Sequence, residues 1–183
     1  MAALKHALVE DRIIEGQGTS REQWLHGFEQ QPLSLLNFKK FQSKRILIVA
    51  PHPDDEILGC GGLMQQLIML NCQLVIVAVS NGTQSHPHST KYSPDQLDQI
   101  RPQESLAALQ CLDISEYVQR IALNLPDGQI HLHREHLWQE LDKLVKAEDI
   151  LICSYAQDGH PDHEAVGKTV QAYALAHDMS YLH

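Results

Sequence analysis

The stretch that decides the fold is Ile46-Leu-Ile-Val-Ala50, which runs directly into Pro51-His52-Pro53-Asp54-Asp55-Glu56. Because apolar and polar residues do not alternate in its first part, it is typical of a strand covered on both faces, as strands of parallel sheets are. Two further runs, at residues 74–79 and 150–153, have the same character, and residues 117–122 form a weaker fourth candidate. The chain is therefore expected to build a mainly parallel sheet.

Helical segments are predicted between these strands, because apolar residues recur there at helical spacing. They lie after Glu56, over about 95–112, over 137–145 and over 166–174. Pro102 is expected near a helix start or at a kink, since proline has no backbone N–H to donate. Alternating strands and helices imply right-handed βαβ units, and hence a three-layer α/β/α sandwich.

The first 44 residues differ from the rest and are predicted to form a helical extension packed on the sheet, with the main domain over residues 45–183. A second short helix is expected after Ser20, which supplies an N-cap. The first is suggested by apolar residues at helical spacing, Leu4, Leu8 and Ile13. A segment of this length is too short to bury a core of its own.

The composition is that of an acidic chain about one domain long. Over 183 residues, 14 Lys and Arg stand against 23 Asp and Glu, which gives a net charge of −9 with the 12 His neutral. This balance argues against nucleic acid and anionic membranes as partners, since such binding relies on Lys and Arg. No apolar stretch approaches the roughly 20 residues of a membrane span, and the first residues do not resemble a secretory signal. A cytoplasmic protein is expected, because its four cysteines are isolated and suggest core thiols in a reducing compartment: Cys60, Cys72, Cys111 and Cys153.

Two strand-to-helix turns share one pattern. His52-Pro53-Asp54-Asp55 follows the first strand, and His160-Pro161-Asp162-His163 follows the strand at 150–153. Proline and acidic residues at a helix start are ordinary capping chemistry. For either turn alone, helix capping is therefore an alternative to a metal site. Capping does not require a histidine before each proline, however. Because ligands bind at the carboxyl ends of the strands in such a sheet, the two turns together indicate a metal site.

Imidazole and carboxylate ligands without thiolate suit Zn²⁺, with Fe²⁺, cobalt or nickel as alternatives. A catalytic zinc keeps one position open for water and takes three protein ligands, for which the candidates are His52, Asp55 and His163. Asp54 would then act as general base on the water. His160 would stabilise an oxyanion or protonate a leaving amine, with Asp162 holding its tautomer.

These motifs resemble the LmbE-like/PIG-L family of metal-dependent de-N-acetylases: Pro-His-Pro-Asp-Asp-Glu, a glycine-rich helix start, and then Asp-x-His-Pro-Asp-His. The similarity spans about residues 44–177 and includes Arg101-x-x-Glu104 and Leu125-Pro126-Asp127-Gly128. The resemblance implies a Rossmann-like fold and removal of an N-acetyl group from a small amino sugar or sugar conjugate. It implies the same metal ligands, base and acid as above, and substrate contacts by Arg101 and Asp127. Many members continue past the point that corresponds to His183, so a C-terminally shortened domain is expected.

Other interpretations compete with this one. Gly59-x-Gly61-Gly62 suggests dinucleotide binding, but that fingerprint needs a glycine where Met64 stands, so close helix packing is the preferred explanation. His86 and His88, in the long loop over 80–94, are more typical of solvated residues than of ligands. Among enzymes, the alternative is a metal hydrolase of a non-sugar amide or an ester. A non-catalytic metal- or sugar-binding module is the alternative from another class.

Overall fold

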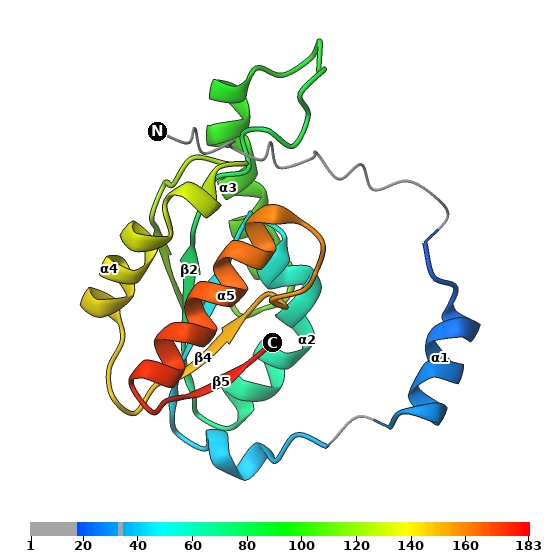
Figure 1. Cartoon of the computed structure of the whole chain (residues 1–183), viewed down its shortest axis with the longest axis vertical. Coiled ribbons are helices and arrows are strands. Elements are labelled where there is room, and N and C mark those ends of the chain that lie inside the picture. The colour runs from blue at the N-terminus through cyan, green and yellow to red at the C-terminus, as the bar shows by residue number, and fades with distance from the viewer. Residues whose placement is uncertain (1–17, 33–34) are drawn as a thin grey trace, which may run out of the picture. The chain divides into compact units, whose positions relative to one another are not determined.

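The computed structural model of the protein describes residues 18–32 and 35–183. The chain divides into two units, Met1–Lys40 and Phe41–His183. Every strand found in the described residues belongs to the second unit (Figure 1). All the residues predicted to form the site also belong to it. No helix within the described ranges is long and apolar enough to cross a membrane.

In the first unit, helix α1 (Arg21–Gln30) begins where the N-cap was predicted. The Ser20 hydroxyl accepts a hydrogen bond from the Gln23 backbone N–H, and the Gln23 side chain accepts one from the Ser20 N–H, which completes a capping box. None of the residues of α1 is buried. The helix predicted around Leu8 lies outside the described residues, and the packing of an extension on the sheet stays a prediction.

In the second unit, five parallel strands form one sheet in the order β3-β2-β1-β4-β5. The strands are β1 (Arg45–Ala50), β2 (Gln73–Ala78), β3 (Val118–Ala122), β4 (Ile150–Cys153) and β5 (Ser180–Leu182). The first four confirm the strands predicted from the sequence. β5 was not predicted, because its three residues carry no apolar run of their own and become a strand only by pairing with β4.

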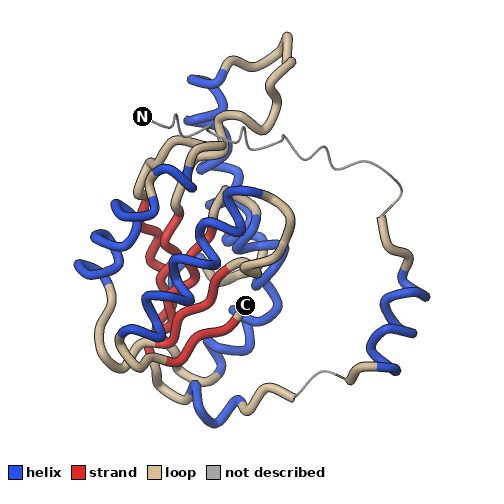
Figure 2. Tube along the Cα trace, in the orientation of Figure 1, coloured by secondary structure: helices blue, strands red, loops and turns tan. Residues whose placement is uncertain are grey.

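Helices cover both faces of the sheet, so the three-layer α/β/α prediction is confirmed (Figures 1 and 2). The helices are α2 (Asp55–Met69), α3 (Pro94–Cys111), α4 (Arg134–Leu144) and α5 (Pro161–Ala176), with short 3-10 turns η1 (Phe38–Phe41), η2 (Ser115–Tyr117) and η3 (Ile130–Leu132). Pro102 lies inside α3 rather than at its start, so the carbonyl four residues earlier lacks its usual helical partner.

Two hydrophobic cores flank the sheet, one on each face. Along β1, Leu47 and Val49 pack into the core that α4 and α5 cover, whereas Ile46 and Ile48 pack into the core of α2 and α3. Successive residues of a strand point to opposite faces, and here both faces are buried. This is why the sequence of β1 from Ile46 to Ala50 is continuously apolar instead of alternating.

The four cysteines are free thiols, and the structure separates them by burial. Cys72 and Cys153 are buried, as predicted, and burial raises the pKa of Cys153 to about 12. Cys60 is only partly buried, and Cys111 is exposed, which corrects the expectation that all four are core residues.

The order of the strands predicts a crevice between β1 and β4, at the carboxyl edge of the sheet. The chain moves from β1 outward to β2 and β3, and then returns to the other side of β1 to form β4. At such a switch point, the connections after the two neighbouring strands leave the sheet in opposite directions and open a crevice at its carboxyl edge. The two turns that share the His-Pro-Asp pattern follow β1 and β4 and therefore lie side by side there.

A close approach between α5 and the end of β4 fixes the second turn. A Cβ atom at Gly167 would lie 2.5 Å from the Ser154 carbonyl oxygen, so only glycine allows this distance. The Ser154 hydroxyl also donates a hydrogen bond of 2.8 Å to the His163 carbonyl oxygen. The glycines at 59–62 were expected to serve close packing, but only Gly61 has a near neighbour, the side chain of Leu112.

Gly167→Ala is expected to lower the free energy of unfolding by about 1–3 kcal/mol, because the new methyl group must push α5 away from backbone atoms. Chemical denaturation would measure the change. Gly62→Ala is the matched control, because Gly62 lies in the middle of α2, on its solvent-exposed side, with no atom near its Cβ position. This substitution should raise the free energy of unfolding by about 0.5–1 kcal/mol. Equal stabilities of Gly167→Ala and the wild type would contradict the close approach.

Candidate metal centre

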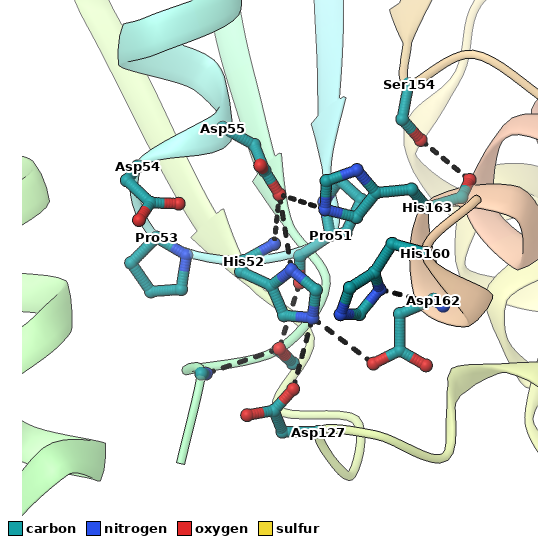
Figure 3. Close-up of polar contacts among 12 residues, drawn as sticks. Pro51, His52, Pro53, Asp54, Asp55, Asp127, Ser154, His160, Asp162 and His163 are labelled. Carbon is teal, nitrogen blue, oxygen red and sulfur yellow. Dashed lines mark hydrogen bonds and ion pairs between the residues drawn. The ribbon is translucent and has the colours of Figure 1, made fainter. Parts of the chain in front are cut away.

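Three turns at the carboxyl edge of the sheet bring polar side chains together (Figure 3). Residues 51–55 follow β1, residues 158–163 follow β4, and residues 127–128 belong to the loop after β3. The first two turns were predicted to meet, and they do. The third joins them from a part of the chain to which only the family resemblance gave a role.

His52, Asp55 and His163 turn their ligand atoms toward one another (Figure 3). Asp55 Oδ2 lies 3.4 Å from His52 Nδ1 and 3.4 Å from His163 Nε2. All three ligand atoms lie within 4.8 Å of one another, which is a suitable spread for ligands of one cation. The structure thus brings together the three residues that were predicted as metal ligands.

The second nitrogen of His52 faces two further carboxylates. Its Nε2 lies 3.1 Å from Asp127 Oδ1 and 3.2 Å from Asp162 Oδ2. Ionised carboxylates only accept hydrogen bonds, so Nε2 carries a proton and, in the neutral ring, the lone pair is on Nδ1 and faces Asp55. A lone pair that faces a carboxylate calls for a positive charge between them. The donor set therefore fits a divalent cation held by Nδ1 of His52.

The electrostatics of His52 agree with this geometry. Burial lowers the pKa of His52, but hydrogen bonds to Asp127, Asp162 and Asp55 outweigh it and raise the pKa to about 11. Burial alone would raise the pKa of Asp55, but its hydrogen bond with His52 and the charge of His163 lower it. The site thus strongly favours a positive charge among its carboxylates, which a proton supplies here and a divalent cation would supply equally.

A second set of potential ligands, His52 with Asp127 and Asp162, shares the same histidine. The oxygens of these two carboxylates already accept backbone N–H groups, from Gln84 at 2.6 Å and from Gly128 at 2.7 Å. Both residues are buried, at 7% and 0% exposed. Carboxylates in this position orient a histidine ligand from behind, so the set with Asp55 and His163 is the better candidate for the cation.

His160 is oriented by a backbone group and not by a carboxylate. Its Nδ1 accepts a hydrogen bond of 3.2 Å from the Asp162 backbone N–H, so the neutral ring carries its proton on Nε2. Burial, together with the charge of His52, lowers the pKa of His160 and keeps the ring neutral. The Asp162 carboxylate, which we expected to hold this tautomer, instead accepts from the Gly128 N–H, from the buried N–H of Ile130 and from His52. The buried Ile130 N–H needs an acceptor, and Asp162 supplies one.

Asp54 occupies the N-cap position of α2, but its side chain makes no capping hydrogen bond. Its φ of 122° is rare for a residue other than glycine, and such strain persists where the surroundings hold it in place. Glu56 Oε2 accepts the Asp54 N–H at 3.2 Å, and Arg101 Nη2 donates to Asp54 Oδ2 at 3.0 Å. Burial raises the pKa of Asp54, although the Arg101 guanidinium opposes that rise. Capping alone therefore does not explain this acidic turn.

The two residues expected to contact substrate have protein partners. Besides Asp54, the Arg101 guanidinium donates to the carbonyl oxygens of Pro53, at 2.7 Å, and Gly82, at 3.0 Å. Asp127 contacts His52 and accepts the Gln84 backbone N–H. Both residues thus join the loops around the site, and their direct contact with a substrate stays a prediction.

Three residues near the site were missed by sequence reasoning. Glu56, only 1% exposed, accepts a hydrogen bond from Ser105, yet in the sequence it looks like one more acid at a helix start. Asp158 lies 3.2 Å from His163 Nδ1 and stands inside the second motif, where it could have been noticed. Gln84 gave no signal, because its contact with Asp127 exists only once two loops have met.

A His-Asp-His group at the switch point of a parallel sheet defines the chain as an α/β protein with a candidate metal centre. Comparison with protein families makes this specific, since residues 47–174 match PIG-L, described as GlcNAc-PI de-N-acetylase. The chain belongs to the PIG-L family, as the motifs indicated.

Individual proteins are also similar to this chain. The 1D-myo-inositol 2-acetamido-2-deoxy-alpha-D-glucopyranoside deacetylase of Kineococcus radiotolerans is 27% identical over 183 residues, which cover 81% of this chain and 50% of that protein. The uncharacterized deacetylase YaiS of Escherichia coli is 29% identical over 130 residues, which cover 67% of this chain and 64% of that protein. The solved structure of N,N'-diacetylchitobiose deacetylase from Pyrococcus horikoshii matches with a TM-score of 0.64 at 22% identity. The match covers 86% of this chain and 59% of that one, and it supports the fold. The chain thus spans between about half and two thirds of the curated relatives it matches.

The protein is expected to bind one Zn²⁺, and His163→Ala should abolish that binding because it removes one of three ligands. Metal analysis after dialysis and the shift of the melting temperature with added Zn²⁺ or a chelator would measure it, since a ligand that binds only the folded state stabilises it. His88→Ala is the control, because His88 lies exposed in the loop before α3. Full Zn²⁺ binding by His163→Ala would contradict the assignment.

Proposed function

We propose that this chain carries the catalytic part of a metal-dependent de-N-acetylase that hydrolyses the N-acetyl group of an amino sugar or sugar conjugate. The observation that carries the proposal is the meeting of His52, Asp55 and His163, with Asp54 beside them, in a member of the PIG-L family. The names of the relatives, deacetylases of an acetamido sugar on inositol and of diacetylchitobiose, support the substrate class. We propose both the activity and the substrate class for this chain, since it spans only part of the length of those relatives.

In the proposed enzyme, His52 Nδ1, Asp55 and His163 Nε2 hold the metal, with Zn²⁺ as the first candidate and Fe²⁺ as an alternative. A bound divalent cation lowers the pKa of water and polarises a carbonyl group. The chain contributes the orientation of the ligands, since Asp127 and Asp162 fix the His52 ring from behind. Partners of this kind typically tune metal affinity as well as geometry.

Asp54 is the proposed general base. It follows Pro53 on the strained turn, and Arg101 anchors its Oδ2 at 3.0 Å. Burial raises the pKa of Asp54, although the Arg101 guanidinium opposes that rise, and a raised pKa makes the carboxylate a stronger base. In the reaction, Asp54 takes a proton from water as the water oxygen bonds to the acetyl carbon.

His160 is the proposed partner for the developing negative charge. Its ring is neutral with the proton on Nε2, because Nδ1 accepts from the Asp162 backbone, so Nε2–H is available to donate to an oxyanion. When the carbon–nitrogen bond breaks, the leaving amine needs a proton. Asp54, which holds the proton from water, and His160 are the two groups proposed to supply it, and the products are acetate and the free amine.

The substrate class has one alternative within the enzymes and one outside them. A non-sugar amide or an ester would use the same metal, base and acid, and a binding module would need only the metal ligands. The side chains of Asp55 and His163 are partly exposed, at 24% and 20%, so solvent can reach both, as either alternative requires. We favour the enzyme because a binding module has no use for a strained carboxylate such as Asp54 beside the metal ligands. A cytoplasmic location remains part of the proposal.

The purified protein with Zn²⁺ is expected to release acetate from N-acetylated sugars. The panel would include N-acetylglucosamine, diacetylchitobiose and an inositol-linked N-acetylglucosamine, with N-acetyl amino acids and an acetate ester for the alternatives, and acetate would be quantified. His163→Ala serves as the control for metal-dependent release. Release from the amides or esters of the second group only would favour the alternative enzyme, and release from none, with Zn²⁺ bound, would favour the binding module.

Asp54→Asn should lower kcat by about 10²–10⁴-fold, the usual contribution of a general base, while the bound Zn²⁺ is unchanged. Acetate release and metal content would be measured on the same preparation. Asp95→Asn is the control, because it removes an exposed carboxylate at the start of α3. Wild-type turnover in Asp54→Asn would disprove its role as the base.

A further inference from the structure

Asp158 connects the loop after β4 to the metal centre. Its Oδ1 lies 3.2 Å from His163 Nδ1, and the same oxygen accepts the His160 backbone N–H at 3.1 Å. The Asp158 backbone N–H donates to the Tyr155 carbonyl oxygen at 3.1 Å, which closes a turn. The carboxylate is thus held by the loop on one side and faces the imidazole on the other, although its side chain is exposed to solvent.

The chemistry of imidazole makes this contact decisive for His163. A neutral ring has one N–H and one lone pair, and an ionised carboxylate can only accept. Of the two carboxylates against this ring, Asp158 lies nearer to its nitrogen, at 3.2 Å, and so favours the tautomer with the proton on Nδ1 and the lone pair on Nε2. That atom is the one that faces Asp55 Oδ2, at 3.4 Å. Without Asp158, Asp55 at Nε2 would favour the opposite tautomer, with the proton on Nε2.

The arrangement repeats, with the nitrogens exchanged, what is seen at His52. There Nε2 donates to the carboxylates of Asp127 and Asp162, and Nδ1 faces Asp55. Each of the two imidazole ligands thus has one nitrogen against a carboxylate and the other toward the shared Asp55. Histidines that bind metals commonly have this second partner.

We propose that Asp158 is a positioning residue that fixes the tautomer and ring orientation of His163, so that Nε2 is presented as a metal ligand. The inference rests on the proposed metal centre and deepens it. Asp158 does not touch the substrate in this role, and it acts only through His163. A purely structural role, as an acceptor for the His160 N–H within the loop, is the competing explanation.

Zn²⁺ affinity separates the two explanations without using catalysis. Asp158→Ala should weaken Zn²⁺ binding by about 10–100-fold in competition with a chromophoric chelator, as loss of a histidine's second partner does. Asp158→Asn, which keeps a neutral acceptor for Nδ1–H, should weaken it less. Gln157→Ala is the matched control from the same turn, since its side chain contacts the Tyr155 hydroxyl and not a histidine, and its affinity should equal that of the wild type.

A spectroscopic measurement tests the tautomer directly. Long-range ¹H–¹⁵N spectra of the Zn²⁺-loaded wild type should show His163 protonated on Nδ1 and bound through Nε2, and Asp158→Ala should lose that single state. A loop-only role would lower the melting temperature of Asp158→Ala but leave its Zn²⁺ affinity and the His163 spectrum unchanged, which would overturn the proposal. Absence of Zn²⁺ binding in the wild type would instead overturn the proposed function and this role together.

Discussion

The structure around the candidate centre depends on one imidazole held between carboxylates that come from different turns. His52 has Asp55 at one nitrogen and Asp127 and Asp162 at the other, and the ring is largely buried. Charges of one sign at such short range are unstable in a medium of low polarity unless a positive charge lies among them. The carboxylates therefore require the imidazolium or a cation, and that requirement ties together the loops after β1, β3 and β4.

Strand order explains why this cluster can form. β1 and β4 are neighbours in the sheet although about a hundred residues separate them in the chain, and the connections that follow them diverge at the switch point. Gly167 lets α5 approach the backbone at Ser154, which brings the start of the helix, with Asp162 and His163, up to His52. The precision of the candidate site is thus a consequence of backbone packing some distance from it.

The three histidines are distinguished by what holds their second nitrogen. Carboxylates lie against the second nitrogen of His52 and of His163, whereas a backbone N–H donates to Nδ1 of His160. The first two rings are thereby suited to bind a cation, and burial keeps the third neutral with its own N–H free to donate. The division between metal ligands and the acid partner can be seen in these partners, although all three residues stand in similar His-Pro-Asp motifs.

The sequence by itself determined the four longer strands, the layered fold and the candidate ligands His52, Asp55 and His163, because apolar runs and motifs at strand ends are local patterns that survive without knowledge of the contacts. Only the tertiary structure decided that Asp162 turns to His52 and not to His160, and that Arg101 anchors Asp54. These choices depend on which buried donors lie within reach after folding, and β5 likewise exists only through its neighbour. A sequence specifies the groups that are available, whereas their partners follow from the distances that packing creates.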